Sequence, residues 1–263
     1  MASGPWRQKC RNKDFSKMND FESILAERLA VLRQEGLYRE LQRVDSPQSR
    51  LIEIAGQTLL NFSSNDYLGL ANESALKLAA LEAVERYGAG SGASRLVCGS
   101  VAPHHDLDDA LAHFKGTEAA LSFSTGYAAA MGAICALLGK DDVIVVDKLA
   151  HACIVDGARL CGAKLRVFAH NDLNELETIL KWAAAKTGSH ILVATASVFS
   201  MEGDQAPLRE IVGLKEQYGA WLMVDEAHAT GLYGANRRGL AEELGVSNHV
   251  EIQMGTLGKA LGA

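Results

Sequence analysis

Apolar and polar positions follow a regular order along most of this chain. Short runs rich in Val, Ile, Leu and Ala indicate buried strands, and apolar residues three or four positions apart indicate helices that bury one face. From residue 104 onward the two kinds of segment alternate. The expected helices are 104–114, 126–138, 151–161, 173–186 and 208–218, and the expected strands are 119–123, 143–146, 165–168, 191–196, 221–224 and 250–254. This order predicts an α/β fold, with a mostly parallel sheet covered by helices on both faces.

The first hundred residues are less regular. Asp20 is a suitable N-cap for a helix that ends at Gly36, and the apolar stripe of this helix is expected to pack on the rest of the protein. The segments that follow are a polar connection with short edge strands (37–57), a strand (59–62), a polar turn (63–69) and a helix (74–87).

Residues 1–17 are basic, because Asp14 is their one acid and five cations accompany it: Arg7, Lys9, Arg11, Lys13 and Lys17. We interpret them as a disordered extension. A leader ahead of a second start at Met18 and a functional basic arm fit about equally well, and a transit peptide fits less well. The expected organisation is therefore this extension, an N-terminal segment (18–58) and a large α/β domain (59–263).

Composition excludes several classes of protein. The 263 residues are 48% apolar and 22% charged, which suits a globular protein with a buried core. A net charge of −6 argues against a nucleic-acid surface. The longest apolar run, 128–138, is about half the ~20 residues that span a bilayer, so no membrane segment is expected. The five cysteines have no paired spacing, which predicts reduced thiols in a cytoplasmic protein.

The segment 88–93, GAGSGA, matches the dinucleotide fingerprint G-x-G-x-x-A as a string. That fingerprint must follow a strand and open a helix, whereas this segment follows a helix, so binding of NAD is not expected. The glycines instead predict an irregular, close-packed segment with left-handed backbone.

Candidate chemical groups fall where the expected strands end, which is where open α/β sheets bind ligands. Asp225 ends an apolar strand and His228 follows it, while Lys259 lies in a glycine-rich turn after the last strand. Gly126 and Tyr127 begin a helix whose N-terminus could hold a phosphate. A lysine that forms a Schiff base and a carboxylate for a pyridinium nitrogen are what pyridoxal phosphate (PLP) requires.

These motifs resemble those of the α-oxoamine synthase family of fold type I PLP enzymes. The order and spacing agree over most of the chain, from about Met18 onward, and the large domain of that fold is therefore expected here. The segments that carry the resemblance are 62–70 (FSSNDYLGL), 90–96 (GSGASRL), 147–152 (DKLAHA), 198–204 (VFSMEGD), 225–228 (DEAH) and 254–262 (MGTLGKALG).

The resemblance implies a role for each candidate. Lys259 would bind PLP covalently and then act as a base at the substrate α-carbon, with a pKa lowered by burial and by the cationic ring. Asp225 would hold the proton on the ring nitrogen, and His151 would stack on the ring. His228 and Ser200 would bind its 3-oxygen. Contacts to the phosphate would come from Gly126, Tyr127 and Thr256.

The other histidines, namely His104, His105, His113, His170, His190 and His249, have no such placement and are given structural or solvent roles. No metal is expected, because they lack ligand spacing backed by cysteines or acids. The segment 88–93 lies at the dimer interface in the resembling family, so a homodimer of the full-length protein is expected.

The implied reaction is a decarboxylative condensation of L-alanine with a pimeloyl thioester of CoA or an acyl carrier. The alternative within the family is glycine C-acetyltransferase, and a non-catalytic subunit with a PLP-enzyme fold is the alternative outside enzymes. Members of the family continue well past the lysine into a C-terminal domain. We therefore expect these residues to be a fragment, inactive alone, in which the strand 250–254 lacks a neighbour and apolar surface is exposed.

Overall fold

The computed structural model describes residues 16–186 and 188–263, which form two compact units. One contains the residues up to Ser46 and Glu53–Thr58, and the other contains Pro47–Ile52 and Leu59–Ala263. In the first unit, helix α1 (Ser16–Gln34) ends before Gly36, whose φ of 68° is left-handed. Whether its apolar stripe packs as expected stays a prediction, as does the division into domains. Of the extension predicted over 1–17, residues 1–15 lie outside the described residues. Residues 16 and 17 belong to α1, so Asp20 lies inside the helix and the prediction that it is the N-cap is wrong.

A two-stranded hairpin consists of β1 (Leu51–Ile54) and β2 (Gln57–Leu60). Its two-residue turn, Ala55–Gly56, has positive φ at both positions, 50° and 74°, which is the backbone of a type I′ turn and matches the twist of paired strands. The turn fixes where the second strand begins. The strand predicted over 59–62 therefore starts two residues earlier, at Gln57, and ends before Phe62.

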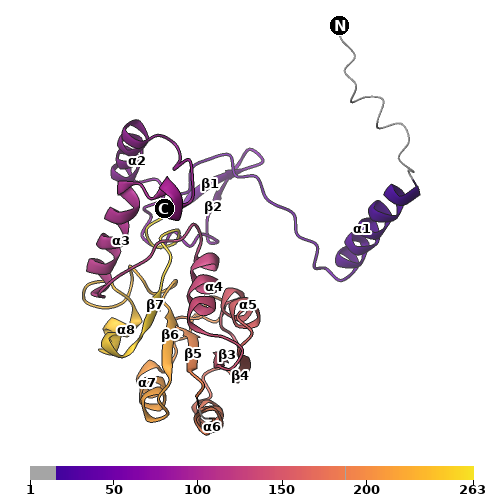
Figure 1. The fold of residues 1–263 in the computed structure, drawn as a ribbon. Helices are drawn as coiled ribbons and strands as arrows, with labels where there is room; N and C mark the ends of the chain where they lie inside the picture. Colours follow the sequence, from indigo (N-terminus) through magenta and orange to yellow (C-terminus); the bar gives the residue numbers. More distant parts are fainter. Residues whose placement is uncertain (1–15, 187) are drawn as a thin grey trace. The chain divides into compact units, whose positions relative to one another are not determined.

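The second unit is built on a five-stranded sheet in the order β4-β3-β5-β6-β7, in which every pair is parallel (Figure 1). This confirms the predicted α/β class. Strand β7 pairs with β6 and has no second neighbour among the described residues, as expected for the strand over 250–254. The strands are β3 (Val143–Asp147), β4 (Lys164–Phe168), β5 (Ile191–Ala196), β6 (Trp221–Asp225) and β7 (Ile252–Met254).

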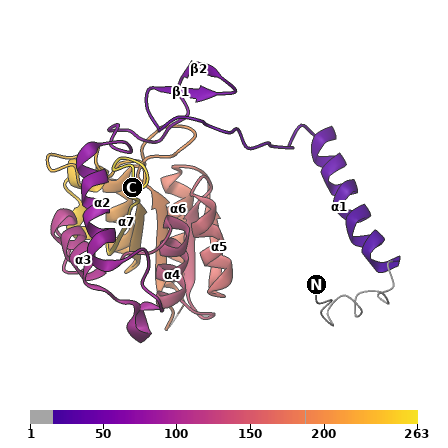
Figure 2. The same cartoon turned by 90° about the horizontal axis from the view of Figure 1, so that it is seen from above.

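Alternate residues of the central strands contribute to two separate cores, because successive side chains in a strand point to opposite faces. Val143 and Val145 pack with α6 (Leu173–Ala184) and α7 (Leu208–Gln217). Ile144 and Val146 pack on the other face, with α4 (Gly126–Leu137) and α5 (Ala152–Leu160). Figure 2 shows α4 and α5 side by side. Helices on both faces explain why these strands are apolar along their whole length.

Helices α2 (Ser74–Tyr87), with the predicted bounds, and α3 (Ala102–Lys115) lie between the hairpin and α4 in the sequence. The segment between them contains the predicted left-handed glycines, Gly88 and Gly92, and a turn of π-helix, η1 (Arg95–Gly99). The prediction of close packing is wrong, because no atom lies within 4 Å of a Cβ added at Gly88, Gly90 or Gly92.

The strand predicted over 119–123 is wrong, because this segment joins no sheet. Leu121 is 73% exposed, and the N–H of Ser122 donates at 2.7 Å to the Asp108 carboxylate instead of to a neighbouring strand. Two short elements were not predicted, the one-turn helix α8 (Leu240–Glu243) and the 3-10 turn η2 (Ser247–His249). No helix in the described part of the chain is long and apolar enough to cross a membrane.

Candidate active site

A cavity of about 200 Å³ opens at the carboxyl ends of β3, β5, β6 and β7. All the residues to which the sequence assigns a site role line it. They are Gly126, Tyr127, His151, Ser200, Asp225, His228, Thr256 and Lys259. The parallel sheet explains this convergence, since the carboxyl ends of its strands share one edge. Their individual chemical roles stay predictions.

Lys259 follows β7 and projects its amine into the cavity, where Nζ lies 2.9 Å from Nε2 of His228. The next residue, Ala260, is 1% exposed and lies so close to Gly231 that a Cβ at Gly231 would meet its methyl group at 2.7 Å. This contact anchors the turn that carries the lysine. Burial lowers the pKa of Lys259, against the opposing charges of Asp225 and Cys153, in the direction that the sequence predicted.

Asp225 and Glu226 are adjacent buried carboxylates with different hydrogen bonding. Glu226 accepts from the Ser197 hydroxyl at 2.8 Å and from the N–H groups of Leu240 and Ala241 at 3.0 and 2.9 Å. Asp225 lines the cavity, and the N–H of Ala227, at 2.9 Å, donates to one of its oxygens. Burial raises the pKa of Asp225. Asp225 therefore retains acceptor capacity for a cationic donor in the cavity, whereas both oxygens of Glu226 already accept hydrogen bonds from protein groups.

His228 connects Lys259 to a residue that the sequence interpretation missed. Its Nδ1 lies 2.6 Å from the hydroxyl of Tyr67, which belongs to the polar turn before α2. Burial, together with the charges of Lys259 and His151, lowers the pKa of His228 to about 4, so the ring is neutral near pH 7. Burial raises the pKa of Tyr67, so it stays protonated. The motif NDYLG pointed to this turn but not to the tyrosine as a partner of His228.

His151 is the N-cap of α5, where its Nδ1 accepts from the N–H of Cys153 at 3.3 Å. The thiol of Cys153 lies 2.9 Å from the same nitrogen and also lines the cavity. Burial raises the pKa of Cys153 to about 11, so it remains a neutral thiol. The sequence interpretation assigned no chemical role to Cys153, because its spacing matches no thiol motif.

The N-terminus of α4 supplies backbone donors at the cavity. Thr125 caps this helix by accepting from the N–H of Ala128 at 3.0 Å, which leaves the earlier N–H groups at Gly126 and Tyr127 facing the cavity edge. The Tyr127 hydroxyl is bound by the Asp156 carboxylate. The N–H groups of Gly126 and Tyr127, together with the Thr256 hydroxyl that lines the same cavity, form a site for an anion such as a phosphate.

Residues 57–263 match the model of the aminotransferase class I and II family. The chain therefore belongs to that family, and the solved structures below confirm the predicted fold class.

Among curated proteins, the chain is similar to the 8-amino-7-oxononanoate synthase of Geobacter sulfurreducens, with 52% identity over 90% of this chain and 60% of that protein. Serine palmitoyltransferase of Sphingomonas wittichii has a TM-score of 0.84 at 35% identity, over 95% of this chain and 62% of the other. The S. paucimobilis enzyme, solved with a bound PLP–myriocin aldimine, has a TM-score of 0.84 at 31% identity, over 96% and 62%. The chain spans about 60% of the length of the curated relatives it matches.

Proposed function

We propose that this chain binds PLP through Lys259 and provides the cofactor site of an 8-amino-7-oxononanoate synthase. Such an enzyme condenses L-alanine with a pimeloyl thioester. The observation that carries the proposal is the meeting of Lys259, buried Asp225 and the N-terminus of α4 around one cavity. Identity of 52% to a synthase of this name, against 35% to serine palmitoyltransferase, favours this activity among related acyl transfers.

The cavity offers a protein group for each polar part of PLP. The amine of Lys259 suits the aldehyde carbon, and the carboxylate of Asp225 suits the ring nitrogen. Backbone N–H groups at Gly126 and Tyr127, with the hydroxyl of Thr256, suit the phosphate. When bound, PLP supplies an electron sink for negative charge at the α-carbon of an amino acid.

Lys259 would hold the cofactor through its amine. Its lowered pKa leaves more of the amine neutral near pH 7 than on an exposed lysine, and a neutral amine can attack a carbonyl. The same amine would serve as a base toward the α-carbon of the substrate. The imidazole of His228, 2.9 Å away, restrains the amine.

Asp225 holds a proton on the ring nitrogen of the cofactor. The carboxylate is 6% exposed, and burial raises its pKa. A protonated ring nitrogen placed against Asp225 would favour the charged form of the carboxylate. The attraction between the two charges would be strong, because little water reaches this buried position to screen them.

Three further side chains contact the cofactor ring in this proposal. His151, from the loop after β3, would lie against the face of the ring. His228 and Ser200, from the loops after β6 and β5, would donate to its 3-oxygen. Since Tyr67 is protonated and donates to Nδ1 of His228, the proton of the neutral imidazole lies on Nε2, the nitrogen on the cavity side.

The overall reaction joins the α-carbon of L-alanine to the acyl carbon of the thioester and releases the alanine carboxylate as CO2. The products are 8-amino-7-oxononanoate and the free thiol of CoA or an acyl carrier. We also propose that the protein acts as a homodimer in the cytoplasm. The free cysteines among the described residues, Cys98, Cys135, Cys153 and Cys161, are typical of a reducing compartment.

The test is a coupled assay with two substrate pairs. Release of thiol from L-alanine and pimeloyl-CoA, and not from glycine and acetyl-CoA, supports the proposal. The reverse preference assigns the chain to glycine C-acetyltransferase. Turnover of neither pair by a chain that binds PLP on Lys259 agrees both with the non-catalytic alternative and with the expected inactivity of these residues alone.

A further inference from the structure

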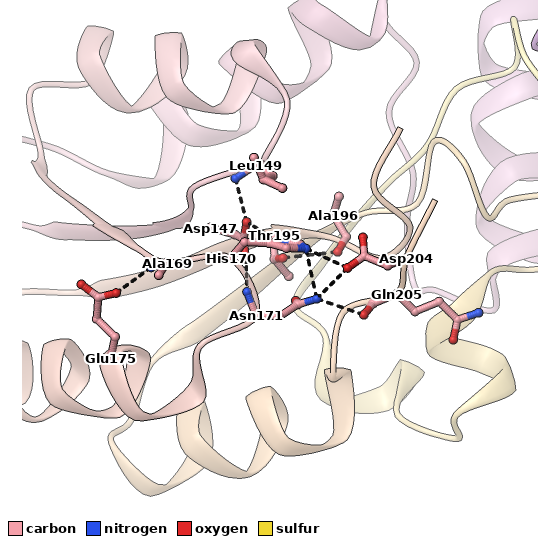
Figure 3. Close-up of polar contacts among 10 residues, drawn as sticks. All are labelled: Asp147, Leu149, Ala169, His170, Asn171, Glu175, Thr195, Ala196, Asp204 and Gln205. Atoms are coloured by element: carbon pink, nitrogen blue, oxygen red, sulfur yellow. Dashed lines mark hydrogen bonds and ion pairs between the residues drawn. The ribbon is translucent and has the colours of Figure 1, made fainter. Parts of the chain in front are cut away.

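Two loops that follow neighbouring strands meet at a buried carboxylate, Asp147, the last residue of β3 (Figure 3). Its side chain is 0% exposed. Oδ1 accepts from the N–H of Leu149 at 2.8 Å and lies 3.1 Å from Nδ1 of His170. Oδ2 accepts from the N–H of Asn171 at 3.0 Å. Asp147 therefore joins the loop after β4 to the loop after β3.

His170 extends this connection to the loop after β5. Its Nε2 lies 2.8 Å from Oδ2 of Asp204, and its ring packs edge to face on Phe199, with centroids 4.3 Å apart. The amide of Asn171 donates to the same Asp204 oxygen and to the carbonyl of Gln205, both at 3.3 Å. Three strand-end loops are thus linked by one small group of polar side chains.

Both ring nitrogens of His170 face carboxylate oxygens. An ionised carboxylate only accepts hydrogen bonds, so this arrangement favours a proton on each nitrogen and an imidazolium ring, although the amide nitrogen of Asn171 also lies 3.3 Å from Nε2. Burial lowers the pKa of His170, but the hydrogen bonds and charges of Asp204 and Asp147 outweigh this and raise it. On the adjacent helix α6, the carboxylate of Glu175 is bound by the N–H of Ala169 at 2.7 Å.

The loops after β3 and β5, which His170 joins, both reach the cavity. The loop after β3 contributes Leu149 and His151 to its lining, and the loop after β5 contributes Val198 and Ser200. His170 is not one of the described residues that line the cavity. The histidine is therefore placed to affect the cavity through the two loops and not by touching its contents.

We propose that His170 is a positioning residue, whose imidazolium, clamped between Asp147 and Asp204, fixes the loops that bring His151 and Ser200 to the cavity. The cofactor contacts of these two residues rest on the proposed function, whereas the clamp does not. A group with a raised pKa stabilises the fold below its unfolded pKa, and this contribution is lost as pH rises through the folded value. The clamp therefore weakens on the alkaline side.

Hydrogen exchange of the cofactor-free chain, followed by mass spectrometry, tests the clamp. His170→Gln removes one of the two charge-assisted hydrogen bonds, so we expect about tenfold faster exchange in residues 147–151 and 198–205. His249→Gln is the matched control, because His249 also pairs with a carboxylate, that of Glu216 at 2.5 Å, but on an exposed surface. The control should leave both loops unchanged.

A second variant and an NMR titration distinguish loss of the clamp from a general folding defect in His170→Gln. Asp204→Asn changes a carboxylate that is 45% exposed, so the fold should persist while the pKa of His170 falls. In the unsubstituted chain, that pKa should lie above about 6.5. The proposal is overturned if the pKa of His170 is ordinary or lowered. It is also overturned if His170→Gln leaves hydrogen exchange in the two loops unchanged, or accelerates exchange equally throughout the sheet. Neither the hydrogen-exchange measurement nor the NMR titration uses PLP. If the cofactor assignment is wrong, PLP will form no adduct with Lys259, while the clamp around His170 will still be observed.

Discussion

Helices α2 and α6 have similar lengths and similar apolar content, yet only one of them is packed. Leu176, Leu180 and Ala183 of α6 are fully buried against the sheet. No residue of α2 is buried, and its Leu81 is 65% exposed. The difference shows that the sequence pattern decides whether a helix forms, whereas burial of its face depends on a partner surface. The candidate site residues lie in the packed part of the chain, and the first three predictions below each pair a residue there with a matched one in α2.

The largest effect is expected for Lys259→Ala. This variant should lose the covalent cofactor completely, because no other amine lines the cavity among the described residues. Lys77→Ala is the control, since Lys77 in α2 bonds Asn72 at 3.1 Å. Borohydride reduction in the presence of PLP, followed by peptide mass spectrometry, gives the measurement. A pyridoxyl group found on any lysine other than Lys259 would contradict the assignment.

Asp225→Asn should leave PLP bound but slow turnover by a factor of about 10³ or more, which is roughly 4 kcal/mol in the barrier. The amide cannot hold the ring proton as an anion does. Glu82→Gln removes a carboxylate from exposed α2 and should have no effect. The measurement is kcat of the active enzyme with alanine and pimeloyl-CoA, and turnover of Asp225→Asn near the unsubstituted value would make Asp225 a structural residue.

Leu180→Ala should lower the free energy of unfolding by about 2–5 kcal/mol, because it leaves a cavity between α6 and the sheet. Leu81→Ala should change it by no more than about 0.5 kcal/mol in a monomer. Urea titration measures both. A cost at Leu81 close to that at Leu180 would mean that α2 is packed in solution, and a cost that grows with protein concentration would support the proposed homodimer.

The smallest effect concerns pH. The pKa of His228 is lowered to about 4, while an unfolded histidine titrates near 6.5. The unfolded chain therefore binds more protons in this window, and stability should fall as pH drops from about 6.5 to 4. The slope should be below about 1.4 kcal/mol per pH unit, because solvent screens a partly exposed ring. His228→Gln should reduce it, as measured by urea titration at several pH values, and an unchanged slope would assign it to other groups.

Much of the sheet could be predicted from the sequence because its strands are continuously apolar and its helices have clear periodicity. Asp225, Gly126 and Lys259 could be proposed from their places at strand ends and a helix start, whereas the roles of His151, Ser200, His228 and Thr256 came from the resemblance to a known family. The strand expected over 119–123 was wrong because an apolar run cannot reveal whether a neighbouring strand exists. Tyr67 and Cys153 were missed since their roles depend on which segments meet in space. His170 was given a structural or solvent role, and no local pattern indicates the two carboxylates around it.

The contact between Glu226 and Gly239 limits how this enzyme fold could be redesigned. Gly239 has a φ of 139°, and a Cβ there would lie 2.6 Å from the buried Glu226 carboxylate. Any library that varies the loop before α8 must therefore keep both positions fixed, because larger residues at 239 would displace the carboxylate beside Asp225. Ala235 is the exposed residue of the same loop that suits variation, whereas Asn236 is hydrogen-bonded to Glu242 and Arg237 has a φ of 61°.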